Sequence, residues 1–244
     1  MTGIILAAGK SQRMKSDLPK VLLPLAGKPL LFYVLKVAQE SGLARIIIVV
    51  GRSHNQVKKA LAGAKVEFVL QKKLLGTADA VKTCANLLTD NEEIVVFCGD
   101  TPLLTAKTIK KLIAVHQQAK ADATVLTAIL ENPSGYGRII RDAQSQVTAI
   151  VEERDASDKI KKIKEINSGV FVFRWQSLRP ILNELKPSPI TNEYYLTDAI
   201  VALKASGAKV VAYCTPDSSE ILGVNTKEEF EQVARILAKS DEAA

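Results

Sequence analysis

Short apolar runs alternate along the chain with segments whose apolar residues recur at helical spacing. The short runs predict buried strands, at 3–8, 46–50, 66–70, 94–98, 124–130, 170–173 and 209–213. The periodic segments predict helices, at 30–41, 55–62, 76–88, 109–116, 177–185, 195–205 and 230–237. Because strands that alternate with helices form parallel βαβ units, this order predicts an α/β fold, a Rossmann-like, mostly parallel sheet with helices on both faces.

The pattern changes near residue 132. A turn at 134–138 leads into the short apolar pair Ile139-Ile140, and the run 147–151 is the expected partner strand. Lysines between 159 and 164 are typical of a solvated helical face. We see no repeat and no low-complexity linker, so we expect one domain over 1–244 with two lobes, about 1–130 and about 131–225.

Composition and charge narrow the class of protein. The net charge of +7 favours an anionic ligand, but aromatic residues are only 5%, so we expect no nucleic-acid partner. Cys84, Cys98 and Cys214 lack the spacing of metal ligands and fall in apolar stretches, where we expect small buried side chains. The odd cysteine count and the lack of a signal sequence predict a cytoplasmic protein. The apolar N-terminal run is too short to cross a membrane, so no membrane partner is expected.

The loop after the first predicted strand carries Gly9 and then three cations, Lys10, Arg13 and Lys20. Glycine lets the backbone approach a ligand closely, and successive N–H groups of such a turn form a concave site for anions. The loop therefore indicates binding of several phosphates. The alternative is a solvated basic loop with no ligand.

Two known phosphate-binding motifs do not fit this loop. A P-loop requires a glycine where Ile4 stands. The dinucleotide fingerprint requires glycines where Ser11 and Met14 stand, which also makes a dehydrogenase the weakest interpretation. The sequence therefore predicts a phosphate loop of another kind.

Two further oxygen-bearing side chains follow predicted strands or precede helices. Asp100 comes directly after the strand at 94–98, at the sheet edge where ligands of open parallel sheets bind, so it is a candidate ligand for Mg²⁺. The alternative is a turn or helix-cap aspartate ahead of Pro102. Asn225 is a candidate second ligand of the metal. The sequence alone favours a different role for it, as the cap of a helix that starts near Lys227.

Candidate ligand-binding residues also follow the third predicted strand. Gln71 offers an amide donor and acceptor, which match the N3–H and O4 edge of uracil. Gly76 and Thr77 open the next predicted helix, where backbone N–H groups are free. Without further information, these three residues are an ordinary loop and helix start.

The second lobe contributes four candidates, which are Gly137, Glu152, Asn167 and Tyr195. The three polar side chains flank apolar strands or a helix start, and such groups can bracket the hydroxyls of a sugar, while Gly137 can offer its N–H. Each of them is, by itself, more often a turn or surface residue.

The motifs that carry these residues resemble those of sugar-phosphate nucleotidyltransferases. The resemblance is closest to the uridyltransferase half of bacterial bifunctional N-acetylglucosamine-1-phosphate uridyltransferases, and it spans nearly the whole chain. The first loop is shared widely, whereas the later motifs point to the N-acetylglucosamine branch. The motifs are 6–14 with 18–22, 75–78, 99–103, 135–138, 150–153, 165–169, 193–198 and 223–225.

The resemblance implies a role for each candidate. Arg13 and Lys20 would act on the phosphates as the catalytic pair. The uridine would be held by Leu6, Ala8, Gly9, Gln71, Gly76 and Thr77, in a nucleotide-binding lobe at about 1–130. The sugar would be held by Gly137, Glu152, Asn167 and Tyr195, in a sugar-binding lobe at about 131–225. Asp100 and Asn225 would hold Mg²⁺. The expected partners are UTP and a sugar 1-phosphate, and the sequence indicates no particular oligomeric state.

Several positions depart from the family's pattern. Ser11-Gln12 stands where Gly-Thr is common, Cys98 replaces a common tyrosine, and Ala78-Asp79 stands where Gly-His is frequent. These departures bear on nucleotide preference, so CTP, dTTP or GTP remain alternatives, as does a non-catalytic nucleotide-sugar sensor. The chain also ends without the hexapeptide repeats of the two-domain relatives, so no C-terminal β-helix acetyltransferase domain is expected within 1–244.

Overall fold

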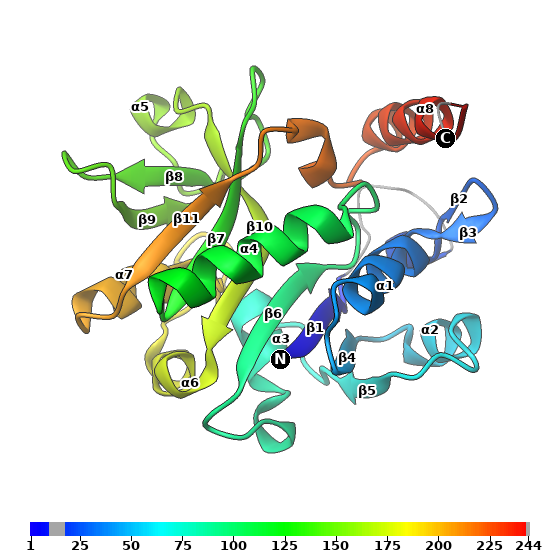
Figure 1. The fold of residues 1–244 in the computed structure, drawn as a ribbon, viewed down its shortest axis with the longest axis horizontal. Coiled ribbons are helices and arrows are strands. Elements are labelled where there is room, and N and C mark those ends of the chain that lie inside the picture. Colours follow the sequence, from blue (N-terminus) through cyan, green and yellow to red (C-terminus); the bar gives the residue numbers. More distant parts are fainter. Residues whose placement is uncertain (10–17, 243–244) are drawn as a thin grey trace.

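The computed structural model describes residues 1–9 and 18–242, and a large mixed sheet runs through its centre (Figure 1). Seven strands lie in the order β11-β7-β10-β6-β1-β4-β5. They are β1 (Thr2–Ala7), β4 (Arg45–Val50), β5 (Glu67–Leu70), β6 (Glu93–Cys98), β7 (Ala123–Ile129), β10 (Glu165–Arg174) and β11 (Val210–Cys214). All run in one direction except β10, which is antiparallel to its neighbours β6 and β7. The predicted α/β fold with a mostly parallel sheet is confirmed.

Helices cover both faces of this sheet. The covering helices are α1 (Leu30–Glu40), α2 (His54–Ala60), α3 (Thr77–Lys82), α4 (Ala106–Ala119), α6 (Trp175–Glu184) and α7 (Asp198–Ala205). The helices α5 (Asp158–Lys161) and α8 (Lys227–Glu242) lie outside these two layers. Ile4 of β1 packs into a core with α3, α6 and α7, whereas the next residue, Ile5, packs on the other face with α1, α2 and α4. Burial on both faces explains why the central strands β1, β4 and β6 are apolar along most of their length. None of the helices within the described residues is long and apolar enough to cross a bilayer.

Two hairpins flank the main sheet. The antiparallel pair β8 (Arg138–Arg141) and β9 (Val147–Val151) was predicted, and β8 also pairs with β10. The pair β2 (Pro24–Leu25) and β3 (Lys28–Pro29) was not predicted, because each strand is too short to show a hydrophobic period. Helix α8 packs on this second hairpin, where its Val233 joins Leu25 in a small separate core.

Two predicted helices are shorter in the structure than the sequence suggests. The helix predicted at 76–88 is α3 followed by a separate 3₁₀ turn, Ala85–Leu87. The helix predicted at 195–205 begins only at Asp198, because the preceding segment is irregular and pairs with the start of α3. There the Tyr194 N–H donates to the Leu75 carbonyl at 2.7 Å, and the Ala78 N–H donates to the Tyr194 carbonyl at 3.0 Å.

The chain order places a ligand crevice beside β1. From β1 the sheet continues through β4 to one edge, and the chain later returns to place β6 on the other side of β1. In open α/β sheets, ligands bind beyond the carboxyl ends of the strands at such a switch point. Leu6 pairs in register with Cys98, so the loops that carry Gly9 and Asp100 leave the same edge side by side.

Candidate active site

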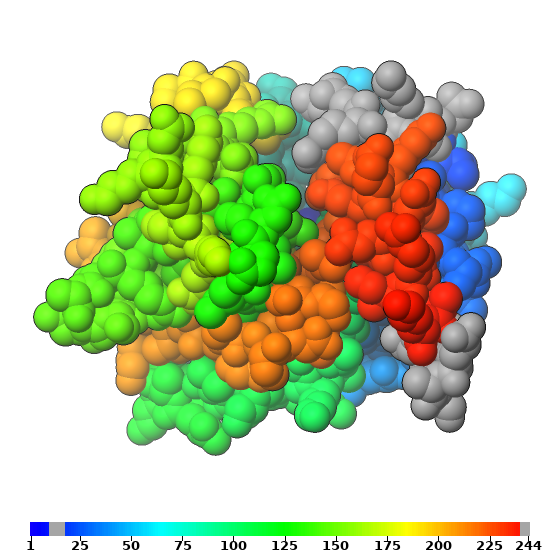
Figure 2. All heavy atoms as spheres, turned by 90° about the horizontal axis from the view of Figure 1, so that it is seen from above, coloured from blue at the N-terminus to red at the C-terminus, as the bar shows by residue number. Residues whose placement is uncertain are grey.

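A cavity of about 560 Å³ opens at this switch point, beyond the carboxyl ends of β1 and β6. Figure 2 looks onto this edge, with α8 in red on one side and the green segments of β8 and β9 on the other. The predicted site residues that line the cavity are Leu6, Ala8, Gly9, Lys20, Gln71, Gly76, Thr77, Asp100, Glu152, Tyr195 and Asn225. The fold therefore gathers candidates from both predicted lobes around one space.

Lys20 joins Asp100 and Asn225 on one wall of this cavity. Its ammonium group donates to the Asp100 carboxylate and, at 2.8 Å, to Oδ1 of Asn225. The side chains of Lys20 and Asp100 are 17% and 19% exposed, so the pair faces the cavity rather than bulk solvent. An ion pair with this little exposure is screened less than a surface pair. Lys20 and Asn225 are 205 positions apart in the sequence, so only the fold brings the three residues together.

The side chain of Asn225 is available for this contact because its neighbours cap the following helix. The Thr226 hydroxyl accepts from the Glu229 N–H at 3.2 Å, and the Glu229 carboxylate accepts from the Thr226 N–H at 3.0 Å. This reciprocal pair is a capping box at the start of α8. The alternative of Asn225 as the helix cap is therefore wrong.

The alternative for Asp100 is only half right, since the residue lies in a turn with Gly99 but does not cap a helix. Helix α4 is capped by Thr105, whose hydroxyl accepts from the Thr108 N–H at 3.2 Å. The Asp100 carboxylate is instead directed to Lys20.

The Asp100 and Asn225 oxygens suit a hard divalent cation. Both are oxygen donors of the kind that Mg²⁺ takes from proteins, and the ion needs only one or two such groups beside phosphate and water. The Lys20 ammonium group already contacts both side chains, which shows that their oxygens accommodate a positive charge between them. The donor set and its geometry therefore fit the Mg²⁺ ion that the sequence predicts.

Gly76 brings the start of α3 against the backbone of Tyr194. Its φ of +114° is in the region that glycine alone adopts readily, and a Cβ atom there would lie 2.4 Å from the Tyr194 carbonyl oxygen. The Thr77 hydroxyl accepts from the Leu196 N–H at 2.9 Å, and the Ala78 N–H is also bonded. The expectation that the N–H groups at this helix start are all free is therefore wrong for Ala78.

Glu152 and Tyr195 form a second part of the cavity wall. The Glu152 carboxylate accepts from the Thr197 hydroxyl at 2.8 Å, and the Tyr195 and Thr191 hydroxyls are 2.6 Å apart. Burial raises the pKa of the Glu152 carboxyl, the nearby Asp198 carboxylate adds to the rise, and the hydrogen bond from Thr197 opposes it. This wall therefore offers carboxylate and hydroxyl groups, which can bind the hydroxyls of a ligand.

Two of the predicted site residues that the structure describes do not line the cavity, and a third predicted residue, Arg13, lies outside the described part of the chain. Gly137 and Asn167 lie behind Glu152, since a Cβ atom on Gly137 would come within 3.4 Å of Glu152 Oε2 and the Asn167 N–H donates to the Gly137 carbonyl at 2.8 Å. The Asn167 side chain accepts from the Gly169 N–H. Arg13, with Lys10, lies outside the described residues. The binding roles of all three stay predictions.

Cys98 lines the cavity, but it is not an anionic nucleophile. Burial raises the pKa of its thiol to about 12, and the Asp100 carboxylate adds to that rise while Lys20 opposes it. The thiol therefore stays protonated near neutral pH. Of the three cysteines expected to be buried, Cys84 is buried, Cys98 is partly exposed and Cys214, at the end of the edge strand β11, is exposed.

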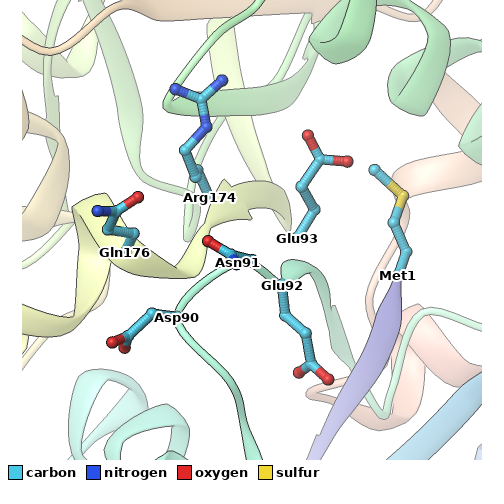
Figure 3. Close-up of a pocket in the computed structure, with 7 residues that line it drawn as sticks. All are labelled: Met1, Asp90, Asn91, Glu92, Glu93, Arg174 and Gln176. Atoms are coloured by element: carbon cyan, nitrogen blue, oxygen red, sulfur yellow. The ribbon is translucent and has the colours of Figure 1, made fainter.

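A second cavity, of about 440 Å³, lies at the opposite edge of the sheet, where β1 and β6 begin. Asp90, Glu92, Glu93 and Arg174 contribute to its lining, and Figure 3 shows that their side chains fan out rather than converge on one point. None of the predicted site residues within 1–9 and 18–242 lines it. The candidate site is therefore the cavity at the carboxyl edge.

Residues 3–165 match the family described as the MobA-like NTP transferase domain. The match covers more than half of the chain and includes the loop after β1 and the Asp100 segment. The chain belongs to the MobA-like NTP transferase family.

Individual relatives of this NTP transferase domain are similar over almost its whole length. The bifunctional protein GlmU of Geobacillus thermodenitrificans is 44% identical over 96% of the chain. The bifunctional protein GlmU of Syntrophomonas wolfei is 39% identical over 97% of the chain. The chain covers 51% and 53% of these two proteins, so it spans about half the length of the curated relatives it matches.

Solved structures support the fold assignment of the NTP transferase domain. The crystal structure of UDP-glucose pyrophosphorylase complexed with UDP-glucose superposes with a TM-score of 0.79, and the match covers 98% of each chain. The apo form of UDP-glucose pyrophosphorylase gives a TM-score of 0.76. Both are 20% identical to this chain, so the likeness establishes a shared fold.

The structure adds residues to the NTP transferase site that sequence reasoning missed. Thr197 and Asp79 contact predicted site residues, Glu152 and Gln71 respectively. Thr197 lies within the motif at 193–198, so the resemblance could have identified it, whereas Asp79 stands out only as a departure from the family's pattern. Three further lining residues lie within the motifs at 135–138, 150–153 and 193–198, namely Gly135, Glu153 and Glu193. Three others lie outside every motif, namely Leu74, Ala80 and Arg154.

Proposed function

We propose that the domain catalyses Mg²⁺-dependent uridylyl transfer from UTP to N-acetylglucosamine 1-phosphate, which gives UDP-N-acetylglucosamine and pyrophosphate. The observation that carries this proposal is the contact of Lys20 with Asp100 and Asn225 inside the cavity that Gly9, Gly76 and Glu152 also line. Membership of an NTP transferase family supports the nucleotide, and the motif resemblance supports the sugar. Within this site the nucleotide lies in the lobe at about 1–130 and the sugar against the lobe at about 131–225.

The reaction needs no general base from the protein. A phosphate oxygen of the sugar phosphate forms a bond to the α-phosphorus of UTP, and the bond from that phosphorus to the bridging oxygen of the β-phosphate breaks, so pyrophosphate leaves. Such transfers depend mainly on positioning and on neutralising the charge of the phosphates. Lys20 binds the α-phosphate, Arg13 binds the departing phosphates, and Asp100 and Asn225 hold the ion. Mg²⁺, when bound, neutralises charge on the triphosphate oxygens.

The residues of the second wall orient the acceptor. Glu152 and Tyr195 carry a carboxylate and a hydroxyl in the same cavity as Lys20, and these groups bind the hydroxyls of the sugar ring. Gly137 lies against Glu152 and is bonded to Asn167, and we expect the Gly137 N–H and the Asn167 amide to contact the sugar as well. This arrangement holds the sugar phosphate in line with the leaving pyrophosphate.

A turnover screen tests the proposal. Release of pyrophosphate is measured for UTP, CTP, dTTP and GTP, each with the 1-phosphates of N-acetylglucosamine, glucose and galactose, in Mg²⁺ buffer. We expect UTP with N-acetylglucosamine 1-phosphate to exceed every other pair by roughly tenfold or more, the discrimination that a few site-specific hydrogen bonds supply. Faster turnover of another pair would reassign the substrates. Binding of UDP-N-acetylglucosamine without turnover of any pair would instead favour a non-catalytic sensor.

A further inference from the structure

Gln71 sits at a position where its amide cannot turn freely. The residue directly follows β5, its N–H donates to the Val50 carbonyl at 2.8 Å, and only 4% of its surface is exposed. It nevertheless lines the cavity. A side chain with so little exposed surface can present only a small part of itself to a ligand.

The hydrogen bonds of Gln71 decide which part that is. Its Nε2 atom lies 3.0 Å from the Gly76 carbonyl oxygen and 2.8 Å from Asp79 Oδ2. A peptide carbonyl and a carboxylate are acceptors only, so the amide atom that faces both must be the nitrogen. An amide nitrogen has two N–H groups, and these two partners use both. The amide oxygen is therefore the group of this side chain that remains for a ligand.

This geometry narrows the expectation drawn from the sequence. There, Gln71 was expected to offer a donor and an acceptor together to a base. In the structure it offers an acceptor, which suits an imide N–H such as N3–H of uracil or thymine. The N3 atom of cytosine carries a lone pair instead, and two acceptors face to face repel each other. The arrangement therefore selects bases by the hydrogen on N3.

We propose that Asp79 is a positioning residue for nucleotide selection, because its carboxylate fixes the Gln71 amide with the oxygen available to the cavity and thereby favours UTP over CTP. The inference rests on the proposed function, since it takes the nucleotide to bind beside Gln71. Asp79 itself does not line the cavity. It lies in the first turn of α3, where the exposed N–H groups of a helix stabilise a carboxylate.

The test compares Asp79→Ala and Asp79→Asn with the unchanged protein. For each, kcat and KM are measured with UTP and with CTP at saturating sugar 1-phosphate, and the dissociation constants of both nucleotides are measured by calorimetry. Asp158→Ala is the matched control, since Asp158 also lies in the first turn of a helix but lines neither cavity. Melting temperatures show whether each variant is folded.

In the unchanged protein we expect kcat/KM to favour UTP over CTP by roughly 100-fold or more. Asp79→Ala should lower that ratio roughly tenfold, because the Gln71 amide loses the partner of one N–H and can then turn. Most of the loss should come from a higher KM for UTP, with kcat changed less than about threefold. Asp79→Asn keeps an acceptor at this position but adds a donor, so its UTP to CTP ratio should fall between those of the unchanged protein and Asp79→Ala. Asp158→Ala should leave the ratio unchanged.

Two results would overturn the inference while leaving the proposed function in place. One is an unchanged UTP to CTP ratio in a folded Asp79→Ala protein. The other is an equal loss for both nucleotides, which would mean that Asp79 only supports α3. If the unchanged protein neither bound nor used either nucleotide, the proposed function would be wrong as well. This outcome is measured on the unchanged protein, so it is distinct from the two results above.

Discussion

Asp100→Ala is expected to slow uridylyl transfer by roughly 10³-fold, since an ion that neutralises phosphate charge contributes several kcal/mol and about 4 kcal/mol corresponds to that factor. Asp100 supplies the carboxylate of the proposed metal site, and Asn225 provides only a neutral oxygen. The variant should therefore also lose binding of Mn²⁺, a spectroscopic substitute for Mg²⁺, when it is titrated in the presence of UTP and followed by electron paramagnetic resonance.

The fold should survive this change. The Lys20 ammonium group keeps its contact with Asn225 Oδ1 at 2.8 Å, and the lost ion pair is open to the cavity. A partly solvated pair contributes up to about 1 kcal/mol, which for a domain of this size lowers the melting temperature by roughly 2–4 °C. The control is Asp90→Asn, because Asp90 is 62% exposed, pairs with Arg179 and lines the second cavity. Normal Mn²⁺ affinity in Asp100→Ala would contradict the metal assignment.

Lys20→Met is expected to slow the reaction by roughly 10²–10³-fold, the usual cost of removing one charged or polar group that stabilises the transition state. Methionine keeps most of the volume of the lysine side chain but removes the cation that the α-phosphate needs. The same cation contacts Asp100 and Asn225, so it competes with a metal for their oxygens. We therefore expect Lys20→Met to bind Mn²⁺ as tightly as the unchanged protein, or more tightly, in the absence of UTP.

Comparing Asp100→Ala with Lys20→Met distinguishes the effect of the lysine on the phosphates from the effect of the aspartate on metal binding. Asp100→Ala should lose both turnover and Mn²⁺, whereas Lys20→Met should lose turnover alone. Lys36→Met is the control for the second variant, since Lys36 is 60% exposed and pairs only loosely with Glu40 at 3.8 Å. Weaker Mn²⁺ binding by Lys20→Met than by the control would show that Lys20 does not compete for the ion.

The position of the site could be predicted from the hydrophobic pattern. The buried runs that became β1 and β6 end at Gly9 and Asp100, and parallel strands bring their carboxyl ends to one edge. Asn225 was ambiguous between helix cap and ligand. The spacing of Thr226 and Glu229 is that of a capping box, so this pattern in the sequence could have resolved the ambiguity.

Other features depend on tertiary contacts that no local pattern encodes. The segment before α7 is not helical because Tyr194 bonds to Leu75 and Ala78, more than a hundred residues away, and these bonds override its helical spacing. Strand β10 begins at Glu165, five residues before the predicted start. The sequence did not show this, because polar residues and Gly169 interrupt the apolar pattern where the register shifts. The orientation of the Gln71 amide likewise follows from where α3 places Asp79.

Crystals grown with UTP and Mn²⁺ test the central claim most directly, because the anomalous scattering of manganese locates the ion without assumptions. We expect one peak about 2.1 Å from oxygens of Asp100 and Asn225, with the Lys20 ammonium group moved from Asp100 to a phosphate oxygen of UTP. A bound UTP with Lys20 still on Asp100, or with manganese elsewhere, such as among the acids at Asp90 and Glu93, would contradict it.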